Sequence, residues 1–368
     1  MDKIYNFSAT AAPLPEAVIN KVREQAFNYN GRGISVMELT PGTKEYTKIL
    51  TETELSLRKI LDIPTGYTVL FLESPTAAQY SAIPLNLMSD RRSADYVVTG
   101  QASKAAQSEA KKFGDIAIAV TSAGASPIFS TVPKVERSDF RPDADYAYIC
   151  YNDFIYGTKF SSSPDTGSIP LAVDMTSSIL SEPIDFSKVA LLLAGGECNV
   201  GVPGLTTVII RGDLLGGCRA DTPTMLNYKK IVDSSSHEFS PSALSIYIAG
   251  KVFEWVDSMG GLEEMKRRSE KRASLIYDFL DGQSQDYYTS FTDKNCRSAT
   301  NVVFTTGDSE LDRKFIAEAA EAGFINLAGH SSVGGMRASL YNSMSQDGVA
   351  ALVEFMKKFK KNNPRFKV

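Results

Sequence analysis

The sequence predicts an α/β protein whose large domain holds a mostly parallel, mixed sheet, and three observations support this. Short runs of β-branched and aromatic residues alternate with amphipathic stretches through most of the chain. At least one helical stretch follows its strand with almost no linker. After about Gly260 a long charged helix begins, and a second set of strand and helix patterns follows it. We therefore expect a large domain over residues 16–260 and a smaller α/β domain formed by residues 1–15 and 261–368.

The predicted elements are short strands separated by helices. Strands are expected at 67–73, 94–100, 116–122, 145–152 and 169–177, and the segment Leu191 to Leu215 is expected to form a strand, a glycine-rich turn and a strand. Helices are expected at 77–88, at 104–113, where charges keep to one face, and at 261–282. In the smaller domain, a strand at 298–306, a helix at 310–323, the segment GMRASLYN and a final helix at 347–361 complete the pattern.

Composition and charge exclude several classes of function. The 368 residues include 43% hydrophobic and 22% charged residues, which is typical of a globular protein. The net charge of -4 is spread along the chain, so we expect no nucleic-acid partner. No apolar run approaches the ~20 residues that span a bilayer, and the amino terminus lacks a signal-peptide pattern. We expect a cytoplasmic protein that is not bound to a membrane.

The cysteines predict neither a metal site nor a disulfide framework. They lie far apart and without CxxC spacing, at Cys150, Cys198, Cys218 and Cys296. We expect reduced thiols and no metal ion.

Six motifs in a fixed order connect the chain to a known family. They are NFSATAAPLPEAV near the start, SVMELTPGTKEY at 35–46, IPLNLMSDRRSADYVVTG at 83–100, DMTSSILSEPIDFSKV at 174–189, AGGECNVGVPGLT at 194–206 and GHSSVGGMRASLYNSM at 329–344. With them, the chain resembles the phosphoserine aminotransferases, class V enzymes of fold type I that use pyridoxal phosphate (PLP), from Asn6 to about Phe359. The resemblance implies a fold-type I PLP-transferase architecture. It also implies a homodimer whose cofactor pocket lies at the subunit boundary.

The resemblance also shows that the lysine which binds the cofactor is missing. The family motif reads roughly AGAQKNxGPAGLT, and its lysine aligns with Cys198. A lysine amine holds the cofactor aldehyde as an imine and shuttles a proton during transamination, which a thiol does not do. No lysine occurs between Lys188 and Lys229. The thiol either fills space as a small apolar side chain or has a redox or nucleophilic role.

Other positions to which the resemblance assigns cofactor or substrate contacts have changed too. A phosphate-cup arginine aligns with Ala77, a stacking indole with Ala102 and a phosphate-binding threonine with Phe154. The remaining replacements are at residues that would contact the partner's cofactor or the substrate phosphate, namely Phe239, Ser240, Pro41, Gly42 and Ser331. We therefore expect no cofactor, whereas the family uses PLP.

Three residues remain as candidate remnants of a site. The resemblance places Asp174 opposite the pyridine nitrogen of the cofactor, and Arg337 on the substrate carboxylate. His330 remains from a His-Arg pair. Each has a structural alternative. Asp174 can accept hydrogen bonds in a turn, Arg337 can pair with a carboxylate inside the small domain, and His330 can be a hydrogen-bonded structural residue.

Three classes of function fit these observations. The first is a catalytically inactive relative, reused as a structural or regulatory binding component of a larger assembly with an unknown protein partner. The second is an active phosphoserine aminotransferase that converts phosphohydroxypyruvate and glutamate to phosphoserine and 2-oxoglutarate. The third is a non-catalytic protein that binds a carboxylate ligand through Arg337 and His330. The loss of cofactor residues along with substrate residues favours the first.

Overall fold

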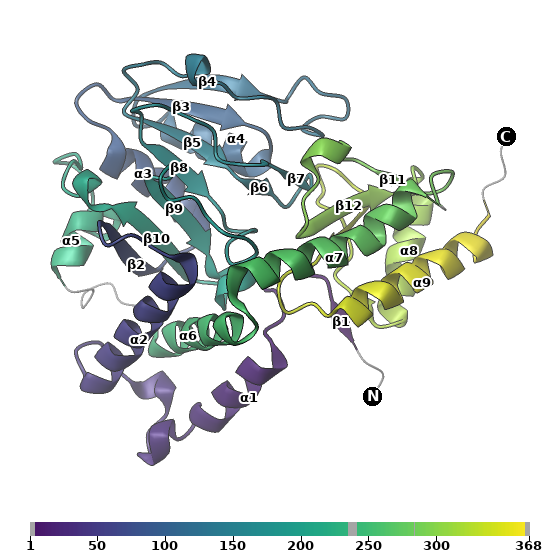
Figure 1. Cartoon of the computed structure of the whole chain (residues 1–368), viewed down its shortest axis with the longest axis horizontal. Helices are drawn as coiled ribbons and strands as arrows, with labels where there is room; N and C mark the ends of the chain where they lie inside the picture. Colours follow the sequence, from purple (N-terminus) through teal and green to yellow (C-terminus); the bar gives the residue numbers. More distant parts are fainter. Residues whose placement is uncertain (1–3, 235–240, 283, 365–368) are drawn as a thin grey trace.

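The structure is a computed structural model that describes residues 4–234, 241–282 and 284–364 (Figure 1). Its main sheet has seven strands in the order β2-β10-β9-β8-β5-β3-β4. Strands β9, β8, β5, β3 and β4 are parallel, and β10 is antiparallel to both β9 and β2, which confirms the predicted mixed sheet. The strands are β2 (Tyr67–Glu73), β3 (Ser93–Val98), β4 (Asp115–Thr121), β5 (Tyr146–Cys150), β8 (Leu171–Asp174), β9 (Leu191–Gly195) and β10 (Leu205–Arg211).

Helices cover both faces of this sheet (Figure 1). On one face, the buried cluster includes side chains from α2, α6 and the start of α7, and on the other face it includes side chains from α3, α4 and α5. The helices are α1 (Glu16–Gln25), α2 (Lys44–Leu61), α3 (Gln79–Leu87), α4 (Gln101–Ala110), α5 (Tyr228–Asp233), α6 (Ala243–Ser258), α7 (Gly261–Asp281), α8 (Ser309–Glu321) and α9 (Gln346–Asn362).

Burial on both faces explains why the central strands have continuous apolar sequences. In β9, Leu192 and Ala194 belong to one buried cluster, while Leu191 and Leu193 belong to the other. A strand covered on both faces needs no polar alternation. Because β9 is buried on both faces, the turn that follows it and contains Cys198 also lies in the interior.

A second, smaller sheet is formed by the carboxyl-terminal part of the chain. It has the order β11-β12-β14, with β11 (Thr289–Ser290), β12 (Asn301–Thr305) and β14 (Met336–Ser339), and it packs with α7, α8 and α9. The first described strand, β1 (Tyr5–Asn6), pairs in parallel with β13 (Phe324–Ile325). A short antiparallel pair joins β6 (Asn152–Asp153) to β7 (Thr158–Lys159). The domain boundaries after residues 15 and 260 stay a prediction.

Most predicted elements are present, with shifts at their ends. The strand at 67–73 is confirmed as β2. The strand predicted over 169–177 ends at Asp174, where the chain turns. Helices α1, α2 and α6 are additional to the predicted ones. Helix α6 is buried on most of its surface, so its sequence shows little amphipathic periodicity. No helix in the described ranges is long and apolar enough to cross a membrane.

One ion pair connects the edge of the main sheet to the loop before β5. The Arg141 Nε donates to Asp95 Oδ1 over 2.7 Å, and the backbone N–H of Arg141 donates to Asp95 Oδ2 over 2.6 Å. The Arg141 Nη1 also lies 2.6 Å from Asp115 Oδ2. Asp95 is only 1% exposed. Because its carboxylate is buried, Arg141 supplies the charge that makes its burial tolerable.

We expect Arg141→Ala to lower the free energy of unfolding by about 3 kcal/mol, because it leaves the Asp95 carboxylate buried without a cation. Urea unfolding measures the change. The matched control is Arg313→Ala, which removes an exposed ion pair with Glu310 and should change stability by less than about 1 kcal/mol. Equal effects of the two substitutions would contradict this account of the sheet edge.

Candidate functional site

Cys198 lies in a five-residue π-helical turn, Gly196–Val200, between β9 and β10. Its thiol is 3.5 Å from the carbonyl oxygen of Ala9 and 3.1 Å from the hydroxyl of Tyr341. The residue is 5% exposed, and burial raises the pKa of the thiol well above its usual range. A buried, protonated thiol is a poor nucleophile, so the space-filling alternative fits this geometry better than a reactive one.

Asp174 lies at the carboxyl end of β8, next to β9. Its Oδ1 accepts hydrogen bonds from the backbone N–H of Thr176 over 3.0 Å and from the Thr176 hydroxyl over 2.6 Å. The hydroxyl of Tyr148 donates to Oδ2 over 3.3 Å, and the hydroxyl of Tyr80 also donates to this carboxylate. Burial nevertheless raises the pKa of Asp174. The turn hydrogen bonds that the structural alternative requires are present.

Arg337 in β14 is a half-buried cation that has no carboxylate partner among the described residues. Its Nε and Nη1 atoms are buried and form no hydrogen bond. The guanidinium lies 5.4 Å from the centre of the Phe154 ring, and burial lowers its pKa. A cation–π contact compensates only part of the cost of burying a charge. Pairing with a carboxylate inside the small domain, the structural alternative for Arg337, is therefore not what the described residues show.

His330 makes only local hydrogen bonds. Its Nδ1 is 2.8 Å from the hydroxyl of Ser332 and accepts the backbone N–H of Ser332 over 3.2 Å. By contrast, Asp174 and Arg337 both lie near enough to Cys198 to influence the ionisation of its thiol. The fold thus groups Asp174, Cys198 and Arg337. Among the described interactions, none connects His330 to this group.

The structure adds three polar residues that sequence reasoning missed. Tyr80 follows the loop after β2 and reaches Asp174, and Tyr341 contacts Cys198. Glu197 accepts a hydrogen bond from the Thr76 hydroxyl over 3.0 Å, and burial raises the pKa of its carboxyl group. Only Glu197 had a sequence signal, its place beside Cys198. The other two come from segments distant in sequence.

The replaced positions differ in where they lie. Ala77 belongs to the exposed turn after β2, and Ala102 and Phe154 are half-buried. Pro41 and Gly42 are exposed on this chain, and Ser331 lies in the exposed loop before β14. The remaining two, Phe239 and Ser240, lie outside the described residues.

Comparison with known proteins gives a consistent result. The family model for class V aminotransferases (Aminotransferase class-V) matches residues 4–352. A phosphoserine aminotransferase of Bacillus cereus is 41% identical over 363 residues, covering 99% of this chain and all of the relative. A solved phosphoserine aminotransferase that records radiation damage of its Schiff base superposes with a TM-score of 0.93 at 35% identity, covering 98% of this chain and all of that one. The PLP-bound enzyme of Trichomonas vaginalis gives 0.88 at 31% identity, with 96% and 100% coverage.

These relatives correct the expectation that no cofactor is involved. One solved relative holds PLP and another records a Schiff base, in the same fold as this chain. The expectation was wrong: it was drawn from Cys198 and from the other replaced contact positions, whereas solved relatives that share this fold hold PLP or record a Schiff base. Noncovalent contacts also hold such groups, and the buried carboxylate of Asp174 is still in place.

The residues present fit PLP only in part. The Asp174 carboxylate is of the right chemistry to face a ring nitrogen. Glu197, by contrast, places a carboxyl group beside Thr76, in the turn where the family resemblance expects a phosphate cup. Position 198 presents a buried thiol instead of an amine. A covalent link through an amine therefore cannot form at this position.

We expect Cys198 in the native protein to resist alkylation by iodoacetamide at pH 8, because its thiol is buried and protonated. Cys218 is the internal control, since it is partly exposed. Mass spectrometry should show Cys198 modified at least about 100-fold more slowly than Cys218, and both modified in the unfolded chain. Equal rates in the native protein would show that the turn opens to solvent.

Proposed function

This chain belongs to the class V aminotransferase family, among relatives of phosphoserine aminotransferase, and from this premise we propose that it binds a small carboxylate without transaminating it. The observation that carries the proposal is the buried, hydrogen-bonded thiol of Cys198 at the position of the family's lysine. Its role is then that of a binding protein, structural or regulatory, on an enzyme fold. A homodimer and a further protein partner both stay predictions.

Because residue 198 has no amine, it cannot perform two steps of transamination. An amine there would exchange with the amine of the substrate and carry a proton between the reacting carbons. Among the described residues, the Cys198 thiol hydrogen-bonds only to the hydroxyl of Tyr341 and the carbonyl of Ala9. When bound, PLP supplies an electron sink for bonds at the substrate carbon. Asp174 is the residue that would hold its ring nitrogen.

Arg337 supports the binding part of the proposal. Two of its guanidinium nitrogens, Nε and Nη1, are buried and have no hydrogen-bond partner among the described residues, so a bound carboxylate would supply a charged acceptor that the described groups do not. The face of Phe154 lies against the guanidinium and orients it. A guanidinium that is partly buried and unpaired lowers the stability of the ligand-free protein. A carboxylate ligand bound to Arg337 would offset this loss of stability.

The comparisons favour a second candidate, an active phosphoserine aminotransferase. Identity of 41% over nearly the whole chain is at least as compatible with an active enzyme as with an inactive one. In that case phosphohydroxypyruvate and glutamate would be the substrates, and an amine other than residue 198 would have to reach the cofactor. A direct assay separates the two candidates.

We expect the purified protein, supplied with PLP, phosphohydroxypyruvate and glutamate, to form phosphoserine at least about 100-fold more slowly than the relative from Bacillus cereus. Borohydride reduction followed by peptide mass mapping tests the covalent step. Cys198→Lys should acquire a reduced cofactor adduct at position 198, whereas in the original protein no lysine should carry a stoichiometric adduct. Turnover within tenfold of the relative would establish the active enzyme and refute the proposal.

We expect Arg337→Met to weaken binding of 2-oxoglutarate or glutamate by about 10- to 100-fold, because a charge-assisted hydrogen bond to the carboxylate is lost. Calorimetric titration measures the affinity, and a thermal melt without ligand checks the fold. Arg313→Met is the matched control, since Arg313 is exposed on α8 and its ion pair is with Glu310. If neither ligand binds the original protein, the carboxylate proposal fails.

A further inference from the structure

A basic hollow is lined by residues of α6, of α7 and of the segment that begins α9. Figure 1 shows where these three helices lie. The volume of the hollow is about 400 Å³. Trp255 of α6 lines one side, the cations of α7 line another, and the first turn of α9 completes it. The cations are Arg267, Arg268, Lys271 and Arg272.

The hollow carries more positive than negative charge. Arg267 and Arg268 share one carboxylate, that of Glu264, with each Nε 2.7 Å from one of its oxygens. Lys271 and Arg272 form no ion pair among the described residues. The acid nearest the start of α9 is Asp347, which is exposed and does not line the hollow. An anion entering this space would therefore meet uncompensated charge.

Arg272 is the strongest feature of the hollow. It is 3% exposed, and its Nε and Nη2 atoms are buried with no hydrogen bond. Burial, together with the neighbouring Arg268, lowers the pKa of Arg272 to about 10. A guanidinium that is buried without a partner is unfavourable unless a ligand completes it. Two adjacent free nitrogens suit a bidentate oxyanion.

The start of α9 adds a second source of positive potential. This helix has 17 residues, and Ser345 caps it by accepting a hydrogen bond from the backbone N–H of Gly348. Ser345 and Gln346 line the hollow. The first N–H groups of a helix have no partner within the helix, and the helix dipole places partial positive charge there. Oxyanions bind at such ends when a cation is also present.

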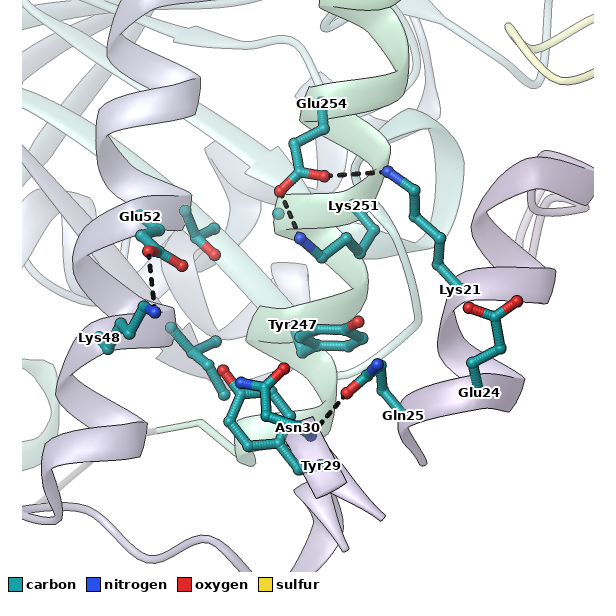
Figure 2. Close-up of a pocket in the computed structure, with 13 residues that line it drawn as sticks. Lys21, Glu24, Gln25, Tyr29, Asn30, Lys48, Glu52, Tyr247, Lys251 and Glu254 are labelled. Atoms are coloured by element: carbon teal, nitrogen blue, oxygen red, sulfur yellow. Dashed lines mark hydrogen bonds and ion pairs between the residues drawn. The ribbon is translucent and has the colours of Figure 1, made fainter. Parts of the chain in front are cut away.

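The cavity between α1, α2 and α6 shows the contrast (Figure 2). It also contains three lysines, but each points to a carboxylate. Lys21 and Lys251 both pair with Glu254, and Lys48 pairs with Glu52. Three glutamates, Glu24, Glu52 and Glu254, line this cavity with the three lysines, so its charges balance, whereas four cations and no carboxylate line the hollow beside α9.

We propose that the hollow formed by Arg272, Lys271, Trp255 and the first turn of α9 binds a phosphate group. Phosphate is favoured over a carboxylate because two unpaired cations and a helix end can compensate a dianion. The volume exceeds what one phosphate fills, so the ligand is a small phosphomonoester whose organic part lies against Trp255. The proposal does not depend on the function proposed for Arg337.

The single tryptophan of the chain makes this proposal directly measurable. We expect inorganic phosphate, titrated at constant ionic strength, to give a saturable change in Trp255 fluorescence. Arg272→Met should weaken the apparent affinity at least about tenfold. Lys266→Met is the matched control, because Lys266 lies on the same helix but lines a different hollow, and it should leave the affinity unchanged. Arg337→Met should also leave it unchanged, which separates this site from the proposed carboxylate site.

Thermal melting provides an independent test. In phosphate-free buffer, Arg272→Met should melt at the same or a higher temperature than the original protein. Phosphate should raise the melting temperature of the original protein only. If Arg272→Met does not fold, Lys271→Met replaces it and should weaken binding about threefold or more. Phenyl phosphate should bind more tightly than inorganic phosphate. Tighter binding of citrate than of either phosphate, or a phosphate response that survives both substitutions, would overturn the proposal.

Discussion

The hydroxyl of Tyr341 is the point at which three distant parts of the chain meet. It donates to the carbonyl of Ala9 over 2.8 Å, lies 3.1 Å from the Cys198 sulfur and accepts a hydrogen bond from the Asn301 side chain over 3.3 Å. The turn after β9 is thereby joined to the amino-terminal segment and to the small sheet. Next to it, the backbone N–H of Asn342 donates to the side chain of Asn199 over 2.9 Å. These buried hydrogen bonds fix the turn that carries position 198.

Arginines that support the fold differ from those in the candidate binding sites in whether a carboxylate already pairs with them. Where a cation only supports the fold, as at Arg141, a carboxylate is already in contact with it. At Arg337 and at Arg272, two guanidinium nitrogens are buried and have no hydrogen-bond partner among the described residues. Because an uncompensated charge destabilises a folded protein, an anionic ligand that pairs with either arginine would stabilise the folded state. Both therefore mark sites by the same physical criterion, although they lie on different elements.

Family membership and the chemistry of one residue support different conclusions about this chain. The class V fold extends over nearly the whole length, and relatives of this fold hold PLP. A fold, however, determines where a reactive group would be placed, whereas the side chain at that place determines what it can do. Here the turn after β9 is retained and Cys198 occupies it. Cofactor binding by the fold and catalysis by residue 198 therefore require separate tests.

The sequence alone determined the alternation of strands and helices, because buried parallel strands produce apolar runs such as Leu191 to Leu193 that need no tertiary information. Its ordered motifs also identified Cys198 and the three candidate remnants Asp174, His330 and Arg337. It could not show that His330 makes only local contacts, or that Tyr80 and Tyr341 reach the site, since those contacts join segments far apart in the chain. The unpaired state of Arg337 and Arg272 was likewise decided only by the tertiary structure, because whether a buried cation has a partner depends on every element packed around it.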